Sequence, residues 1–187
     1  MARICQRSRI WFYSRVSDCE LVSGKPWASQ PVLLKGLGKI EFGSGVRIGY
    51  YPSPYFFNTC CYLEARNASA SIVIGDGVTI NNNCAILAEQ RSIIIGRGVV
   101  MGTNVTIMDS DFHGLAPEER HEVAAAASGD VVIADDCFLG SNVKVMKGVT
   151  IGEGSVIGNG SVVTSDVPAR AIAAGNPARV IRSVSQN

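Results

Sequence analysis

The sequence predicts an all-β solenoid, a chain wound into coils with three flat faces, and three observations lead to this prediction. An aliphatic residue recurs at every sixth position from Ile133 to Val163. A small residue follows each of these four positions later, as Cys137 follows Ile133. A period of six fits neither a helix nor a simple alternating strand. Glycine, which suits a sharp corner between short strands, comes directly after many aliphatic positions, at Gly75, Gly96, Gly102, Gly140, Gly152 and Gly158.

The same six-residue spacing recurs through most of the chain, so each residue of the core can be predicted. Both the aliphatic and the small residue of each unit should point inward and fill a narrow core. The aliphatic positions are Ile40, Val46, Ile74, Ile80, Ile86, Ile95, Met101, Ile107, Ile133, Leu139, Val145, Ile151, Ile157 and Val163. The small positions are Val78, Cys84, Val99, Val105, Cys137, Val143, Val149, Ser155, Ser161 and Val167.

The two ends of the chain are expected to lie outside the coil. Residues 1–35 place basic side chains around the apolar run Ile10–Tyr13, which predicts a cap on the open end or a subunit contact. A peripheral membrane contact is the alternative, because basic residues beside aromatic ones suit an anionic lipid surface. The solenoid domain is expected over residues 36–182, with a tail at 183–187 and a short helix opening near Asn176 and Pro177.

Composition agrees with one domain and excludes several classes of partner. The chain has 187 residues and a formal net charge of +1, without a basic run that would attract nucleic acid. No apolar stretch reaches the ~18 to 20 residues of a membrane span, and no signal peptide is recognised, so a cytoplasmic protein is expected. Cys84 and Cys137, at inward positions, predict reduced structural thiols.

Two segments break the period and are the candidates for function. The aromatic run at 50–57 could line a sugar site by stacking or plug the core beneath the first regular coil. The longer interruption, 108–130, contains both histidines of the chain, His113 and His121. Long excursions from a regular scaffold are often functional, so this loop is the predicted site of chemistry.

The units read as aliphatic, Gly, two variable residues, a small residue and a variable one, and the loop contains His113-Gly114-Leu115 followed by Pro117-Glu118-Glu119-Arg120. Over roughly residues 40–182 this pattern resembles the hexapeptide-repeat acyltransferases, in particular sugar O-acetyltransferases of the galactoside, maltose and surface-polysaccharide types. The resemblance implies a left-handed parallel β-helix, an exception to the right-handed crossover rule. It also implies a homotrimer with active sites between subunits.

The resemblance implies acetyl transfer from acetyl-CoA, with His113 as the general base. Transfer from a thioester to a hydroxyl needs a base that is active near neutral pH, which imidazole can supply. His121 matches no family position and is expected on the surface. Asp109 and Asp111 could orient the second ring nitrogen of His113.

The remaining site residues follow from the resemblance position by position. The backbone amide of Ser141 would stabilise the oxyanion of the acyl carbonyl. Acceptor binding falls on Asn81, Glu89 and Asp111. Coenzyme A contacts fall on Ser141, Asn159, Thr164, Ser165, Arg179 and Arg182, with Ser165 standing where relatives often have Lys.

Three functions remain open from the sequence. The leading one is O-acetylation of a sugar hydroxyl in surface-polysaccharide biosynthesis, such as O-antigen, capsule or exopolysaccharide. The alternatives are N-acetylation of an amino-sugar nucleotide, or acetylation of a xenobiotic such as an antibiotic, and a non-catalytic scaffold. A γ-type carbonic anhydrase needs three histidine ligands per zinc, and this chain has two histidines, so no metal is expected.

Overall fold

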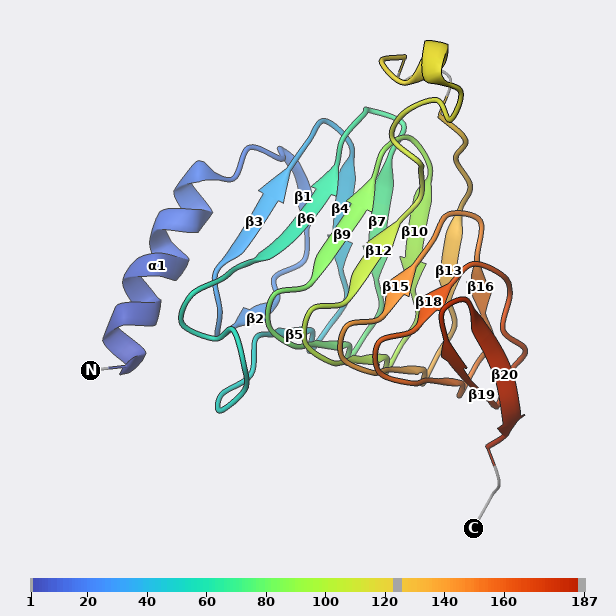
Figure 1. The fold of residues 1–187 in the computed structure, drawn as a ribbon. Coiled ribbons are helices and arrows are strands. Elements are labelled where there is room, and N and C mark those ends of the chain that lie inside the picture. The colour runs from blue at the N-terminus through green and yellow to red at the C-terminus, as the bar shows by residue number, and fades with distance from the viewer. Residues whose placement is uncertain (1, 123–125, 185–187) are drawn as a thin grey trace.

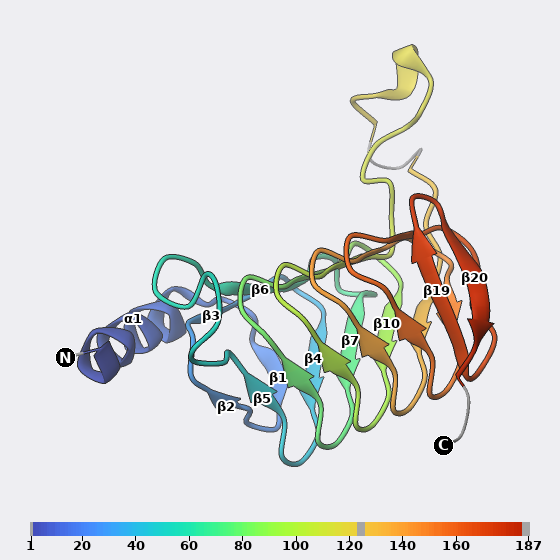
Figure 2. The same ribbon diagram turned by 60° about the horizontal axis from the view of Figure 1, so that its bottom comes forward.

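Three β-sheets form the three faces of a left-handed β-helix in the computed structural model, which describes residues 2–122 and 126–184 (Figures 1 and 2). Each coil gives one strand to each face in turn. Face 1 contains β1 (Leu21–Ser23), β4 (Lys39–Phe42), β7 (Ser71–Ile74), β10 (Ser92–Ile95), β13 (Val131–Ile133) and β16 (Thr150–Ile151). Face 2 contains β2 (Trp27–Ala28), β5 (Arg47–Ile48), β8 (Thr79–Ile80), β11 (Val100–Met101), β14 (Phe138–Leu139), β17 (Val156–Ile157), β19 (Ala171–Gly175) and β20 (Ala178–Ser183). Face 3 contains β3 (Val32–Lys35), β6 (Cys61–Ala65), β9 (Ala85–Ala88), β12 (Thr106–Met108), β15 (Lys144–Val145) and β18 (Val162–Val163).

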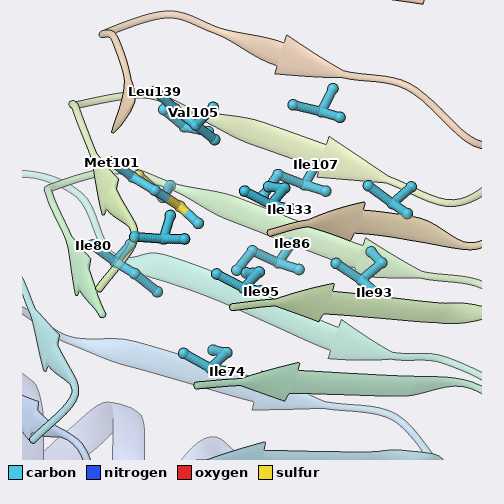
Figure 3. Packing of buried hydrophobic residues seen from close by; sticks show 14 of the residues in the cluster. Ile74, Ile80, Ile86, Ile93, Ile95, Met101, Val105, Ile107, Ile133 and Leu139 are labelled. Atoms are coloured by element: carbon cyan, nitrogen blue, oxygen red, sulfur yellow. The ribbon is translucent and has the colours of Figure 1, made fainter. Parts of the chain in front are cut away.

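The aliphatic repeat stacks in register from coil to coil. On face 1, Ile95 of β10 is paired with Ile74 on one side and with Ile133 on the other. The predicted aliphatic positions are all at most 1% exposed, and the small positions at most 5%. Figure 3 shows the aliphatic side chains meeting inside the coil. The predicted core is therefore confirmed, and each coil buries its apolar side chains against the coils before and after it.

Asparagine side chains stabilise the corner between faces 2 and 3, which we call corner 2–3. Asn83, Asn104 and Asn142 have φ values of 62°, 59° and 62°, in the left-handed region that asparagine tolerates better than most residues. They also form a ladder, because Asn83 Nδ2 donates to Asn104 Oδ1 at 3.0 Å and Asn104 Nδ2 donates to Asn142 Oδ1 at 2.8 Å. Successive coils are thus tied along this corner.

The solenoid begins earlier than the boundary at residue 36 that the sequence suggested. Residues 21–35 already form a complete coil, in which β1 pairs with β4, β2 with β5 and β3 with β6. Val22, Ala28 and Leu34 continue the six-residue phase. No glycine follows them, and this end coil is only partly buried, so the repeat signal is weak there. Only the helix α1 (Ala2–Val16) and its link to β1 lie outside the coil at this end.

The C-terminal end closes with a strand pair, so the expected short helix at Asn176 and Pro177 was wrong. β19 joins face 2 beside β17, and β20 turns back antiparallel to it. The buried hydroxyl of Ser161 accepts a hydrogen bond from the amide of Gly175 at 3.1 Å. Gly175 has a φ of 105°, which glycine tolerates and which lets the chain turn sharply. β20 extends to Ser183, and residues 185–187 of the predicted tail lie outside the described residues. None of the described helices is both long and apolar enough to cross a bilayer.

Candidate active site

The long loop leaves the coil where face 3 turns into face 1, which we call corner 3–1, and projects away from the solenoid (Figure 2). Its described parts are residues 109–122 and 126–130, with a short 3₁₀ helix, η1, at Pro117–Glu119. Two backbone hydrogen bonds close its base: Asp111 N donates to Ala127 O at 3.0 Å, and Gly129 N donates to Asp109 O at 2.8 Å. The excursion thus starts and ends at one point of the coil.

Asp109 anchors the loop to the preceding coil and does not face the histidine. Its side chain is fully buried, and its carboxylate accepts the backbone amides of Glu89 at 2.7 Å, Gln90 at 3.1 Å and Arg91 at 2.7 Å. These three charge-assisted hydrogen bonds engage both of its oxygens. The suggestion that Asp109 orients the His113 ring finds no contact to support it.

His113 is exposed on the loop, and one ring nitrogen is already engaged. Its Nδ1 lies 2.9 Å from the carbonyl oxygen of Gly114. Because a carbonyl can only accept a hydrogen bond, this contact assigns the proton to Nδ1 in the neutral ring. Nε2 then carries the lone pair and has no hydrogen bond to any described residue, which is the tautomer that a general base needs.

Asp111 lies at the base of the loop and pairs with a lysine of a later coil. Its Oδ1 is 2.7 Å from Nζ of Lys147, on the turn that follows β15. Its Oδ2 is buried and has no hydrogen-bond partner among the described residues. Asp111 therefore does not orient the histidine ring here, but it keeps one unused acceptor atom beside the loop.

A cluster of charged side chains on face 3 holds the residue that precedes His113. The Arg66 guanidinium carbon lies 5.0 Å from the centroid of the Phe112 ring, in cation–π range. Phe112 has a φ of 64°, so an aromatic residue occupies the left-handed region. Arg66 Nη1 also contacts Glu89 Oε2 at 2.6 Å. Glu89 is 2% exposed, and its carboxylate is buried against Arg66.

Glu64 completes this cluster. Its carboxylate accepts Nε and Nη2 of Arg66 at 3.0 and 3.1 Å, and this bidentate contact holds the pKa of Glu64 below its usual value. Neither Arg66 nor Phe112 was singled out from the sequence. The available signal was the alternation of Tyr62, Glu64 and Arg66, which marks polar side chains on the outer side of one strand.

At corner 2–3 the Ser141 amide, expected to bind the acyl oxygen, already has a partner. It donates to Asn159 Oδ1 at 2.9 Å. The same arrangement recurs elsewhere: the amide of Arg97, also directly after a corner glycine, donates to Asp135 Oδ1 one coil later at 2.8 Å. The contact is thus a regular feature of the coil. Asn159 is exposed, so its side chain can turn away and release the amide.

The other expected site residues are spread over several edges. Asn81 is half-buried at corner 2–3, and its Oδ1 accepts the amide of Asn82 at 2.8 Å. Thr164 and Ser165 are exposed at corner 3–1, just after β18. Two exposed arginines lie on β20, where each guanidinium has one contact to a backbone carbonyl: Arg179 to Ala178 and Arg182 to Ser183.

The histidine loop and the Ser141 amide lie at opposite edges of face 3. Thr103 stacks on Ser141, since their hydroxyl oxygens are 3.1 Å apart. From Thr103 the chain crosses face 3 to Asp109, which at ~3.3 Å per residue is roughly 20 Å. One chain therefore presents two separate groups of predicted site residues. No set of three or more His, Cys, Asp or Glu side chains within the described ranges is placed to hold a metal ion.

The left-handed coils of six-residue units define the hexapeptide-repeat fold, and the comparisons agree. Residues 130–165 match the family described as bacterial transferase hexapeptide (six repeats). A protein of Agrobacterium fabrum named chloramphenicol acetyltransferase is 32% identical over 149 residues, which are 78% of this chain and 66% of that protein. This chain thus spans slightly less than two thirds of that relative.

Two further proteins extend the comparison. A Staphylococcus aureus (strain JH9) protein named 2,3,4,5-tetrahydropyridine-2,6-dicarboxylate N-acetyltransferase is 38% identical over 60 residues, 32% of this chain and 25% of that one. A hexapeptide-repeat acetyltransferase from Vibrio cholerae O1 biovar eltor, solved with acetyl coenzyme A, is 26% identical with a TM-score of 0.62, covering 99% of this chain and 88% of its own. Residues 130–165 thus match the hexapeptide-repeat family, and most of the chain is similar to acetyltransferases with this repeat.

Proposed function

We propose that this protein is an acetyl-CoA-dependent O-acetyltransferase that acetylates a sugar hydroxyl, with His113 as its general base. The observation that carries the proposal is the exposed ring of His113, whose Nδ1 contacts the Gly114 carbonyl while Nε2 has no hydrogen bond to any described residue. Support for the donor comes from the Vibrio relative, whose structure contains acetyl coenzyme A. The names of the relatives support transfer of an acetyl group.

In the proposed reaction, Nε2 of His113 takes the proton of the acceptor hydroxyl while the hydroxyl oxygen attacks the acetyl carbonyl carbon. The ring is then an imidazolium, and the Nδ1–H bond to the Gly114 carbonyl becomes charge-assisted. As the carbon–sulfur bond breaks, Nε2 returns its proton to the departing thiolate. The products are the acetyl ester and the free thiol, and His113 is neutral again.

We propose that the active site forms between subunits of a homotrimer. In one chain the His113 loop and the Ser141 amide lie at opposite edges of face 3, so a second copy is needed to bring one edge to the other. Leu115 on the loop is 70% exposed, an apolar side chain that a neighbouring subunit would cover. An isolated chain would present base and oxyanion donor too far apart to act on one substrate.

The donor would be held by residues on the later coils. Ser141 would give its amide to the acyl oxygen once Asn159 turns away. Arg179 and Arg182 are exposed cations suited to the phosphates of coenzyme A, and Thr164 and Ser165 are exposed hydroxyls at corner 3–1.

The acceptor would lie beside the loop, and a sugar of surface-polysaccharide biosynthesis is our first choice. Asp111 is the first candidate contact, because its buried Oδ2 has no hydrogen-bond partner among the described residues and would accept a hydroxyl if the loop base opens. Asn81 of a neighbouring subunit is the second. Glu89 is better assigned to holding Arg66, because it is buried and ion-paired.

A second acceptor class has specific support. The Agrobacterium relative, at 32% identity, is named for chloramphenicol, which favours a xenobiotic as the alternative acceptor. The Staphylococcus relative is named an N-acetyltransferase, so an amino group is the third possibility. An assay must therefore compare sugars, amino-sugar nucleotides and chloramphenicol side by side.

The test is the release of free thiol from acetyl-CoA with this acceptor panel, for the wild type, His113→Ala and the control His121→Ala. Both histidines are exposed on the same loop, so the control matches the change in charge and size. We expect His113→Ala to lower kcat/KM by about 10²- to 10⁴-fold, the usual contribution of a general base, and His121→Ala to leave it unchanged. The proposal is refuted if no acceptor of the panel increases thiol release, or if His113→Ala releases thiol as fast as the wild type.

A further inference from the structure

A large cavity lies at the N-terminal end of the described chain, away from the histidine loop. Its volume is about 1250 Å³. It lies between α1 and the first coils of face 2, where Figure 1 shows the helix beside the solenoid and the histidine loop projecting near the other end. The function proposed above makes no use of this cavity.

Buried polar side chains hold the aromatic segment 50–57 that forms one wall. Asn82 is fully buried, and its Nδ2 donates to the carbonyls of Tyr50 and Pro54, both at 2.9 Å. Gln30 is also fully buried, and its Nε2 donates to Tyr55 O at 2.8 Å. The aromatic run therefore does not plug the core. It is fastened outside the core as one wall of a cavity.

The helix that forms the opposite wall is attached to the same segment. Arg9 donates from Nη2 to Thr59 O at 2.6 Å, and Gln6, 3% exposed, donates to the carbonyl of Phe56. Phe56 itself is 9% exposed and lines the cavity. Both walls are thus fixed to each other by hydrogen bonds, and the space between them is a built feature.

Three cationic side chains line this cavity without a partner. Arg7 comes from α1, Lys25 from the turn before β2, and Arg47 from β5. No ion pair or side-chain hydrogen bond joins any of the three to another described residue, and the lining includes no Asp or Glu. By contrast, Lys39 on face 1 contacts Glu41 at 2.6 Å. Three unpaired positive charges around one space favour an anion with more than one charge.

Three aromatic side chains of the lining are largely uncovered. Trp27 is 75% exposed, Tyr50 57% and Tyr51 60%. Large rings with this exposure leave apolar surface in water that a bound planar or apolar group would cover. The cavity therefore combines a multiply charged anion site with ring faces for an apolar or planar body.

We propose that this cavity binds a phosphate-bearing ligand whose charge lies among Arg7, Lys25 and Arg47 and whose apolar or planar part packs on Trp27 and the tyrosines. Phosphate fits better than a carboxylate because it carries up to two charges and several acceptor oxygens. Such a group can come from a soluble nucleoside diphosphate or from the headgroup of an anionic lipid. The site is independent of the His113 chemistry.

The test uses the two tryptophans of the chain, of which Trp27 lines the cavity and Trp11 does not. In a Trp11→Phe background, emission of Trp27 is titrated with uridine diphosphate, with uridine as the phosphate-free control. In parallel, sedimentation with phosphatidylglycerol vesicles is compared with phosphatidylcholine vesicles. We expect saturable binding in one of these two arms, and the arm that binds identifies the source of the phosphate.

Matched variants decide whether that binding uses the cavity. Arg47→Glu should weaken binding at least 10-fold, and Trp27→Ala should weaken it as well. Lys39→Glu makes the same charge change on face 1 and should bind as the wild type does. If circular dichroism shows that Arg47→Glu does not fold, Arg47→Gln replaces it in the binding measurements. The proposal fails if neither probe binds, or if the Arg47 variants bind as tightly as Lys39→Glu.

Discussion

The two edges of face 3 carry similar polar residues but use them differently. At corner 2–3, side chains bond to their equivalents in the next coil, as in the ladder of Asn83, Asn104 and Asn142. At corner 3–1, polar side chains bond to the excursion that leaves there: Asp109 binds three amides of the preceding coil, and Arg66 contacts Phe112 of the loop.

This difference separates stabilising polar residues from positioning ones. A corner whose polar groups satisfy each other adds to the stability of the coil and presents few unused atoms. A corner whose polar groups hold a loop fixes what the loop carries, here the ring of His113. Mutations in the ladder should therefore affect stability alone. At corner 3–1 a mutation should affect stability where a buried residue anchors the loop, as at Asp109, and activity where a residue holds Phe112, as at Arg66.

The largest effect is expected at Asp109. Asp109→Ala leaves three backbone amides without their acceptor in a buried position, and we expect a loss of about 3 kcal/mol in the free energy of unfolding. Urea denaturation followed by circular dichroism measures this loss. Asp166→Ala is the control, because Asp166 is exposed and accepts only the Thr150 amide. If the control is destabilised as much as Asp109→Ala, the three buried hydrogen bonds of Asp109 stabilise the coil no more than one exposed bond at the same kind of corner.

A change at Arg66 should lower activity more than stability. Arg66→Lys keeps the charge but cannot contact two carboxylates and stack on Phe112 at once, so we expect kcat to fall about 10-fold, which is ~1.4 kcal/mol of barrier. The acceptor KM and the Tm should change little.

Phe112 gives the matched pair for that experiment. Phe112→Tyr keeps an aromatic ring under the guanidinium and should retain wild-type kcat, whereas Phe112→Leu should behave like Arg66→Lys. Wild-type kcat in both Arg66→Lys and Phe112→Leu would show that this contact does not position His113.

The smallest effect is expected in the asparagine ladder. Asn104→Ala removes two side-chain hydrogen bonds and places alanine at a φ of 59°, and we expect a loss of about 1 to 2 kcal/mol. Asn104→Gly removes the same bonds but tolerates the backbone angle, so it should recover part of the loss. Thermal unfolding compares the two variants, with activity unchanged in both. Equal Tm values would mean that the backbone angle costs alanine nothing.

The sequence predicted the coils because their signal is local and repeated. Each inward position is set by its own residue type, so Ile133 or Val143 can be assigned without knowing its neighbours in space. The end coil was missed because Ala28 is small and no glycine directly follows Val22, Ala28 or Leu34, as it follows many later aliphatic positions. The C-terminal strand pair was missed because Asn-Pro suits a turn as well as a helix start.

The candidate site was predictable only in part, because its contacts join residues far apart in the chain. The loop and His113 stand out through composition and through the break in the period. The partners of Asp111 and Glu89, which are Lys147 and Arg66, depend on which coils stack on each other. No local pattern contains that information.

The way the long loop is inserted makes it a separable part of the protein. One coil earlier, residues 89–91 suffice to join β9 to β10, whereas residues 109–130 join β12 to β13. The coils on either side nevertheless pair as if nothing lay between them, with Ile95 beside Ile133. Ser110 and Ser128 are bridged at the base, so the ends of the insert are close together. The corner can therefore accept a foreign segment whose ends meet, which makes this solenoid a rigid frame for displaying grafted loops.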